Sequence, residues 1–302
     1  MQIFKNKITW MDMVSPSEEE LKEIKEKYQI HPLILEELKV PSARAKAEIY
    51  DHYIFLVLHF PNWNPVTETS EPFELDVVLG KDFIITASFQ QQVEMRQELF
   101  EKVAYVDFEK KYLDESPIEL FSFIVNNFLD FTMRQVCHID QKIGKISGQL
   151  FAGSEMKLIK EIAHIKRDVL DFRRIYRWLK EILDSLCRIG PRMFGEKSKV
   201  YFDDLAGESL KVEHTIESFA DTIESLEATN NSLIENRINV LTRTYTIISF
   251  ITWPTLLVIG TFQMNAVNIP ITGLPYDYFI MIALAFIPSI ILYLTLKSKK
   301  LF

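Results

Sequence analysis

The stretch TYTIISFITWPTLLVIGTF, residues 244–262, decides the architecture of this chain. It contains 19 residues without Asp, Glu, Lys or Arg, and a second charge-free stretch of the same length, YFIMIALAFIPSIILYLTL, follows at 278–296. A helix needs about 20 apolar residues to cross a hydrocarbon core of about 30 Å. We therefore predict two transmembrane helices, with a pair of buried core helices in a large soluble fold as the alternative.

The charges around the two spans predict their direction. The connection 263–277 holds no Lys or Arg, whereas basic residues flank the opposite ends of both spans. These residues are Arg237, Arg243, Lys297, Lys299 and Lys300. Because basic residues stay on the cytoplasmic side, we expect a multi-pass protein of the cytoplasmic membrane with both termini cytoplasmic and 263–277 outside.

The overall composition excludes several classes of protein. The 302 residues carry a net charge of −8, which argues against nucleic acid as a partner. The two cysteines, Cys137 and Cys187, form no CxxC motif, so we expect no disulfide framework. Phosphate-binding and hydrolase motifs are absent from the sequence, and the six histidines show no metal-ligand spacing. We expect no enzymatic activity and no cofactor.

The first 115 residues have the pattern of an α+β cytoplasmic domain. Strand signals occupy 7–13, 44–61, 72–80 and 82–89, and they predict a mainly antiparallel sheet. Helical patterns occupy 15–29, with Ser15 as the expected N-cap, and 31–39. We expect these helices to pack on the sheet.

Helical periodicity then dominates the chain. Two patterns, Ile118–Ile146 and Ser154–Ile189, predict a helical hairpin over 116–200, ended by Gly190 and Pro191. A single stalk helix is expected over 201–262, about 90 Å long at about 1.5 Å per residue, continuing into the first span. The external loop 263–277, the second span 278–296 and a cytoplasmic basic tail 297–302 complete the chain.

A polar stripe runs along the first span. Its members recur at steps of three and four, as one face of an α-helix does: Glu235, Asn239, Thr242, Thr246, Ser249, Trp253, Leu256 and Gly260. Lipid offers polar groups no partner, so this face should turn away from it. Two interpretations remain open: hydroxyls bonded to their own helix within a helix–helix contact, or the wall of a pore built by several copies.

The stalk is strongly acidic before it reaches the membrane. Residues 201–236 contain nine carboxylates and one Lys, and Glu213, Glu217, Asp221 and Glu224 share one face. The face is either an ordinary solvated surface or, when copies surround an axis, a cytoplasmic funnel that concentrates cations.

These features together resemble the CorA family of divalent metal ion transporters. That family carries Gly-Met-Asn at the outer end of the first of two C-terminal spans, and this chain has Gln263-Met264-Asn265 there. Further matches are ITWMDM (8–13), HPLILEEL (31–38), AEIYDHYIFLVLHF (47–60), VYFDDL (200–205) and NRINVLTRTYTI (236–247). The resemblance implies a funnel-shaped homopentamer with the stalk helix innermost.

The resemblance also implies roles for particular residues. The triplet would form the selectivity filter, and Lys297, Lys299 and Lys300 would form a basic ring around the funnel neck. The implied pore positions are Asn239, Thr242, Tyr245 or Thr246, Ser249, Trp253, Leu256 and Asn265. The cargo would be Mg²⁺ or another divalent cation such as Co²⁺ or Ni²⁺. Mg²⁺ gives up water reluctantly, and carboxamide oxygens of Asn265 can accept hydrogen bonds from that water.

Several residues depart from the family pattern. Gln263 replaces Gly and either adds amides to the mouth or folds outward. Trp253 is bulky for a pore and either gates it by dewetting or rotates into a helix interface. One carboxylate of the family's regulatory metal site matches Asp204, but its partner position falls near Asn64, where no carboxylate stands. Two alternatives follow: closure by a bound ion is lost, or Asp203 or Glu208 takes the place of the missing carboxylate.

These departures keep two other functions open. One is a divergent member of the family that carries Zn²⁺ or another cation. The other is a membrane sensor or structural protein that does not conduct.

Overall fold

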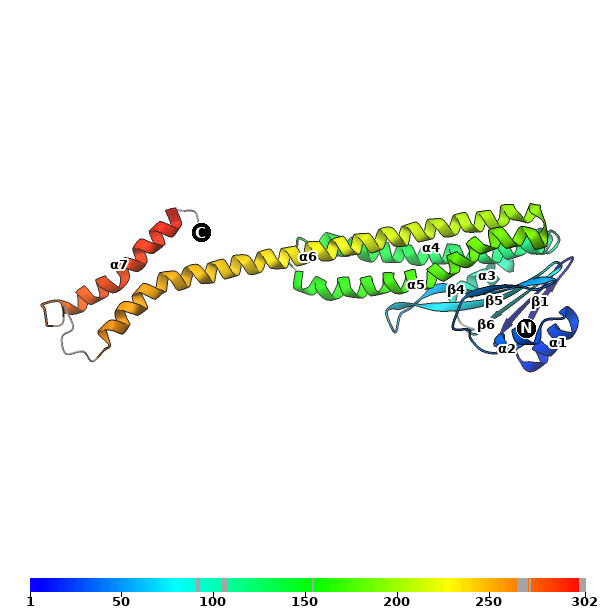
Figure 1. Cartoon of the computed structure of the whole chain (residues 1–302), viewed down its shortest axis with the longest axis horizontal. Helices are drawn as coiled ribbons and strands as arrows, with labels where there is room; N and C mark the ends of the chain where they lie inside the picture. Colours follow the sequence, from blue (N-terminus) through cyan, green and yellow to red (C-terminus); the bar gives the residue numbers. More distant parts are fainter. Residues whose placement is uncertain (91–92, 105–107, 154, 265–270, 272, 299–302) are drawn as a thin grey trace. The chain divides into compact units, whose positions relative to one another are not determined.

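The computed structural model describes residues 1–90, 93–104, 108–153, 155–264, 271 and 273–298. The chain divides into two compact units, Met1–Ala228 and Thr229–Phe302. The first unit combines a sheet with helices, and the second contains the two apolar helical segments. Figure 1 follows the chain through both units from the N-terminus in blue to the C-terminus in red.

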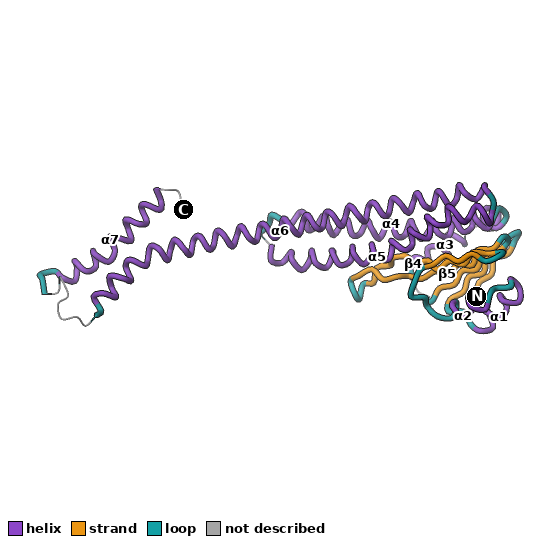
Figure 2. The backbone as a smooth tube through the Cα atoms, viewed as in Figure 1, coloured by secondary structure: helices purple, strands orange, loops and turns teal. Residues whose placement is uncertain are grey.

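The first unit is built on a six-stranded sheet in the order β1-β2-β6-β5-β4-β3. Figure 2 shows the strands in orange and the helices in purple. The strands are β1 Gln2–Lys5, β2 Thr9–Val14, β3 Lys46–Ile49, β4 Tyr53–Asn64, β5 Thr69–Gly80 and β6 Phe83–Ser88. Four neighbouring pairs are antiparallel and only the pair of β2 and β6 is parallel among the described strands. The predicted mainly antiparallel sheet is confirmed.

Helices cover both faces of this sheet. On one face, α1 (Glu18–Tyr28) and α2 (Pro32–Glu37) bury Ile24 and Ile34 against Phe55 and Ile85. On the other face lie α3 (Glu94–Val103) and the long helices α4 (Pro117–Gln149) and α5 (Glu155–Phe194). There the Phe128 ring of α4 lies 5.0 Å from the Phe60 ring of β4. The alternation of strand side chains between two covered faces explains why β4 to β6 are almost continuously buried.

The start of α1 differs from the sequence prediction by two residues. Ser17, and not Ser15, is the N-cap, because the Ser17 hydroxyl accepts from the Glu20 N–H while the Glu20 carboxylate accepts from the Ser17 N–H. Ser15 is instead held by the sheet, where its N–H donates to the Ser88 carbonyl at 2.8 Å. The sequence offers two serines with a Glu three positions later, and the strand pairing selects between them.

Helix α5 runs past the expected stop at Gly190 and Pro191. It continues to Phe194 and ends before Gly195, whose φ of 88° is in the region that favours glycine. Gly190 has a different purpose, because a Cβ atom there would come within 2.1 Å of the Phe202 ring of α6. The glycine thus permits close packing of α5 on α6.

The predicted stalk appears as one helix, α6, from Lys199 to Phe262, and α7 spans Asp277–Ser298. Short helical turns at Glu109–Leu113 and Glu196–Ser198 complete the described helices. Both α6 and α7 contain segments long and apolar enough to cross a membrane, and only 6% and 11% of those segments are buried. These two segments are therefore not buried core helices within the chain.

Candidate functional site

Within the second unit, α7 covers one side of α6. Ile247 of α6 is 8% exposed, and Thr255 and Val258 are partly buried. The residues predicted to line a pore, from Asn239 to Gly260, are all exposed in the single chain. At about 100° per residue, the line through Ile247, Thr255 and Val258 and the predicted stripe lie on roughly opposite sides of the helix.

Hydrogen bonds from Thr255 hold α6 against α7. Its hydroxyl donates to the Ala285 carbonyl at 3.0 Å and lies 2.8 Å from the Ser289 hydroxyl. An apolar groove of about 650 Å³ runs between the two helices. It is lined by Ile251, Thr252, Thr255, Leu256, Phe286, Ser289, Ile290 and Tyr293. Leu256 thus borders α7, although the sequence grouped it with the stripe.

Four other members of the stripe, Thr242, Thr246, Ser249 and Trp253, line a separate groove of about 540 Å³ on α6. Its lining residues are Thr242, Tyr245, Thr246, Ser249, Phe250 and Trp253. Five of these six are predicted pore residues, and the sixth is Phe250. Trp253 is 64% exposed and belongs to this groove and not to the one beside α7.

Two hydroxyls of this groove bond to their own helix. Thr246 donates to the Thr242 carbonyl at 2.8 Å, and Ser249 donates to the Tyr245 carbonyl at 2.9 Å. Bonding of hydroxyls to their own helix is one of the two interpretations that the sequence left open for the stripe. Each hydroxyl oxygen nevertheless keeps lone pairs that can accept a further hydrogen bond. Such a surface offers acceptors, which is what the water shell of a cation requires.

The predicted filter lies at the end of α6. The Gln263 N–H donates to the Ile259 carbonyl at 3.1 Å, which extends the helical bonding beyond Phe262. Gln263 is not among the described residues with positive φ, so its backbone does not need the freedom of the family's glycine. Met264 is 62% exposed, and Asn265 lies outside the described residues. Lys297 belongs to the last turn of α7, whereas Lys299 and Lys300 also lie outside them.

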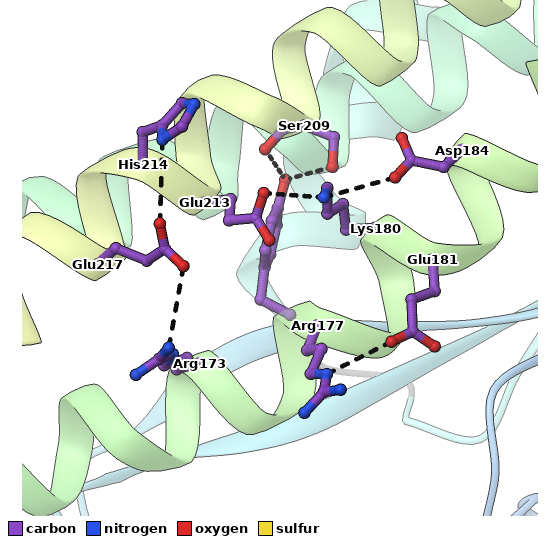
Figure 3. A network of polar contacts seen from close by, with 10 residues as sticks. Arg173, Arg177, Lys180, Glu181, Asp184, Ser209, Glu213, His214 and Glu217 are labelled. Atoms are coloured by element: carbon purple, nitrogen blue, oxygen red, sulfur yellow. Dashed lines mark hydrogen bonds and ion pairs between the residues drawn. The ribbon is translucent and has the colours of Figure 1, made fainter.

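The acidic face of α6 is partly paired with α5 in the first unit (Figure 3). The pairs are Lys180 with Glu213 at 3.0 Å, Arg173 with Glu217 at 3.8 Å, and Lys166 with Glu227 at 2.5 Å. The three basic residues follow one another at intervals of seven on α5, so they share a face. We call this set the ion-pair ladder. Two of the four carboxylates expected to face solvent or a funnel therefore turn to α5.

A buried hydrogen bond lies beside the ladder. The Tyr176 hydroxyl of α5 meets the Ser209 carbonyl and hydroxyl of α6, both at 2.9 Å. Burial raises the pKa of Tyr176 above its ordinary value. Hydrogen bonding to Glu213 raises the pKa of Lys180 above its ordinary range. The two helices are thus joined by both neutral and charged contacts.

The predicted regulatory residues do not form a metal site within one chain. Asp203 and Asp204 are exposed, and Glu208 binds Lys211 at 2.6 Å. Among the described residues, no group of three His, Cys, Asp or Glu side chains could hold a metal. Burial, followed by the nearby charge of Asp203, raises the pKa of the Cys187 thiol.

The sequence reading missed a carboxylate beside Asn64. The Asn64 amide donates to the Glu71 carboxylate at 3.0 Å, and Thr67 donates to the same carboxylate at 2.9 Å. Strands β4 and β5 pair antiparallel here, which brings Glu71 of β5 next to the end of β4. The hairpin spacing was the available signal, because paired strands bring residues several positions apart into contact.

Another cluster of carboxylates is buried in the sheet. Asp76 is fully buried and its pKa is raised to about 9, because burial and the neighbouring Glu74 disfavour its charged form. Glu74 accepts from the Ser42 N–H at 2.8 Å and lies 3.5 Å from His59. Lys46 is bound by Glu37 at 2.5 Å, on the α2 side of the sheet. Burial and the neighbouring Glu74 thus favour the neutral, protonated form of Asp76.

Comparisons with known proteins agree with this geometry. The chain is 23% identical over 296 residues to the cobalt/magnesium transport protein CorA of Thermotoga maritima, which covers 97% of this chain and 83% of that protein. The complete structure of the CorA magnesium transporter of Methanocaldococcus jannaschii matches with a TM-score of 0.82 and 15% identity. That match covers 98% of this chain and 92% of the other.

A second full-length structure, that of the CmaX protein, matches with a TM-score of 0.69 and 17% identity, over 99% of this chain and 90% of the other. At these identities the structural matches establish the fold alone. The sequence profile described as CorA-like Mg²⁺ transporter protein matches residues 5–298. The long helix ending in an apolar segment, the second apolar helix and this match together lead to one conclusion: the chain belongs to the CorA-like family of Mg²⁺ transporter proteins.

Proposed function

We propose that this protein carries divalent cations, with Mg²⁺ as the main cargo, passively across the cytoplasmic membrane through a pore lined by α6. One observation supports this most strongly: the groove of Thr242, Thr246, Ser249 and Trp253 lies on the side of α6 that α7 does not cover. A polar helix face in a membrane needs either another protein surface or water.

The pore requires several copies of the chain. Two apolar helices cannot enclose a water-filled passage, so α6 from each copy must surround a common axis. The family resemblance implies five copies. In this arrangement α7 lies outside and shields α6 from lipid, and Thr255 and Ser289 join the two helices.

The chemistry of the lining suits a hydrated ion. Mg²⁺ prefers to keep its water, and the waters of the ion are hydrogen-bond donors. The O–H groups of Thr246 and Ser249 donate to backbone carbonyls, so their oxygens present acceptor lone pairs to those waters. Amide oxygens of Asn265 at the mouth and Asn239 at the inner end provide the same acceptors. None of the proposed lining residues from Asn239 to Asn265 is a carboxylate, so the ion is held weakly enough to leave.

The orientation follows the charges. We place both termini in the cytoplasm, with Gln263, Met264 and Asn265 at the external mouth and the ring of Lys297, Lys299 and Lys300 at the inner surface. The driving force is the concentration gradient together with the membrane potential, worth about 2.3 kcal/mol per charge per 100 mV.

Closure by cytoplasmic divalent cations is proposed to use Asp204 of one copy and Glu71 of the next. Glu71 provides the carboxylate that Asn64 lacks, and Asn64 holds it in place. Asp203 and Glu208 are the alternative partners, although Glu208 already binds Lys211.

Ion uptake into vesicles that contain the purified full-length chain tests the proposal. We expect Mg²⁺ flux above that of empty vesicles, loss of most of it in Asn265→Ala, and near-normal flux in the control Thr252→Ala. Thr252 lies in the groove beside α7 and bonds to its own helix. Absence of flux for Mg²⁺, Co²⁺, Ni²⁺ and Zn²⁺ would reject a transport function. Stronger flux of Zn²⁺ than of Mg²⁺ would identify Zn²⁺ as the main cargo.

A further inference from the structure

A cleft lies in the first unit where strands β4 and β5 meet helices α4 and α5. It has two halves of about 460 and 400 Å³, and both halves are lined by Trp63, Lys142, Lys145 and Asp168. Ser70 of β5 lies opposite Trp63 of β4 in the strand register, so the two side chains share one face of the sheet. The volume of each half is in the range of small-molecule pockets.

Asp168 of α5 is a buried acid whose charge is only partly compensated. It is 2% exposed, and it is the only buried charged residue among the described residues that line the cleft. Its Oδ1 atom accepts from the Ser70 hydroxyl at 2.8 Å, whereas its buried Oδ2 atom has no hydrogen-bond donor among the described residues. Burial raises the pKa of the Asp168 carboxyl above its ordinary value. A buried acceptor of this kind favours a ligand that brings an N–H donor.

The ammonium group of Lys142 occupies the position that such a donor would take. Its Nζ atom lies 3.6 Å from the centre of the Trp63 ring and 3.6 Å from Oδ2 of Asp168. The second distance is too long for a hydrogen bond, and the Lys142 side chain is 40% exposed. The gap between Trp63 and Asp168 therefore accommodates an alkylammonium group, and Lys142 can leave this gap for solvent.

The walls of the cleft favour a cation with an aliphatic chain. The face of a Trp ring attracts cations, and Trp63 borders both halves. Apolar side chains line each half as well, Ile139 and Phe172 in one and Ile146 and Ile165 in the other. Methylene groups can pack on these side chains, which a hydrated metal ion cannot do.

The second half of the cleft provides carboxylates for a further positive charge. Glu68 and Glu161 line this half together with Asp168. The Glu161 carboxylate lies 4.0 Å from the Lys157 ammonium, at the limit of an ion pair, so a ligand can compete for it. Carboxylates that alternate with apolar walls match ammonium groups that are separated by methylene groups.

We propose that this cleft binds an aliphatic polyamine. One ammonium group lies between Trp63 and Asp168, donates to Oδ2 of Asp168 and displaces Lys142 to solvent. A second ammonium group lies near Glu68 and Glu161, and the methylene groups between them pack on the apolar walls. The inference goes beyond the proposed transport function and does not depend on it, because every residue of the cleft belongs to the unit Met1–Ala228.

Equilibrium dialysis of radiolabelled spermidine against the full-length chain in an uncharged detergent tests the proposal. Asp168→Asn should weaken binding at least about ten-fold, because the ligand loses a charged hydrogen-bond acceptor. Asp221→Asn is the matched control, since it makes the same change at an exposed position, and it should leave the affinity nearly unchanged. An equal loss in both variants, or no binding to the natural chain, would overturn the proposal.

Replacing Lys142 tests the sign of the ligand's charge. Lys142→Met removes the competing ammonium group and should strengthen spermidine binding several-fold, whereas a site for anions would lose affinity. Lys145→Met is the control, because it removes the same charge from the cleft without vacating the gap between Trp63 and Asp168, and its effect should be smaller. Weaker binding in Lys142→Met would overturn the proposal. This test stands even if Asp168→Asn does not fold, because Lys142 is partly exposed.

Two further measurements separate this site from general attraction of cations. Trp63→Leu should weaken spermidine binding several-fold through loss of the ring face, and Trp178→Leu, at an exposed Trp of α5, should not. Mg²⁺ at equal ionic strength should displace little spermidine. Full displacement by Mg²⁺ would overturn the proposal and would assign the cleft to a hydrated metal ion. Mg²⁺ flux into vesicles is measured separately, so a failure of polyamine binding stays distinct from a failure of transport.

Discussion

The Thr255 hydroxyl of α6 donates to the Ala285 carbonyl of α7 and lies 2.8 Å from the Ser289 hydroxyl. In contrast, Thr246 and Ser249 donate to carbonyls of their own helix. The hydroxyls of Thr and Ser therefore have two different roles on α6. On the side facing α7 they join two helices, and on the opposite side they leave oxygen acceptors exposed.

The first prediction concerns this interhelical bond. Thr255→Val removes the donor to Ala285 and the partner of Ser289 while keeping the shape of the side chain. We expect a loss of roughly 0.6–1.7 kcal/mol in the free energy of unfolding, the range for hydrogen bonds between membrane helices. Denaturant titration of the full chain in detergent measures it. Thr252→Val is the control and should cost less, because Thr252 bonds within α6. A double-mutant cycle with Ser289→Ala that shows no coupling would contradict the contact.

The second prediction concerns Trp253 as a hydrophobic constriction. Its ring is 64% exposed on the groove that is proposed to line the pore. Trp253→Ala should raise Mg²⁺ flux several-fold, because a wider and less apolar passage stays wet. Ile248→Ala is the control, since Ile248 is 51% exposed on a different face of α6. Unchanged flux in the Trp253 variant, measured in the same vesicles, would assign the ring to contacts between copies.

The third prediction concerns the buried acid Asp76. Its pKa is raised from 3.8 to about 9 in the folded chain, so the folded state keeps a proton that the unfolded state loses between about pH 4 and pH 9. Stability therefore falls as the pH rises through this window, by at most about 1.4 kcal/mol per pH unit.

Replacing Asp76 by Asn keeps the shape and removes the titration. We expect Asp76→Asn to gain stability relative to the natural chain as the pH rises from 5 to 9, in urea titrations followed by Trp fluorescence. Asp51→Asn, at an exposed position, should stay within about 0.5 kcal/mol of the natural chain. A difference between Asp76→Asn and the natural chain that does not change with pH would show that Asp76 is ionised in the folded state.

The fourth prediction concerns the ion-pair ladder. Lys180 and Glu213 are about one quarter exposed and lie 3.0 Å apart. Lys180→Gln should cost about 0.2–1 kcal/mol, and the cost should shrink at high salt because solvent ions screen the pair. Lys211→Gln is a control, since the Lys211 side chain is 65% exposed in its pair with Glu208. The charge swap Lys180→Glu with Glu213→Lys should recover most of the loss, and a swap that is no better than the single change would argue against a direct pair.

Local patterns in the sequence determined most of the architecture. Apolar runs of 19 residues predicted α7 and the apolar part of α6, and alternating apolar strands predicted the sheet, because both signals arise from neighbours within one element. The polar stripe was also readable, since helical spacing alone places Thr242, Thr246 and Ser249 on one face. The contact between Glu71 and Asn64 was only hinted at by the hairpin spacing, because the contact itself depends on the register between β4 and β5.

Tertiary contacts decided what local patterns left open. The end of α5 was misplaced because Gly190 reads as a helix stop, whereas the structure uses it to admit the Phe202 ring. The acidic face of α6 was predicted to face solvent or a funnel, because the sequence does not show that Lys180 and Arg173 lie across from it. Helical periodicity says which residues share a face. Which side of α6 meets α7 or α5 is determined by packing between distant segments, and that information exists only in three dimensions.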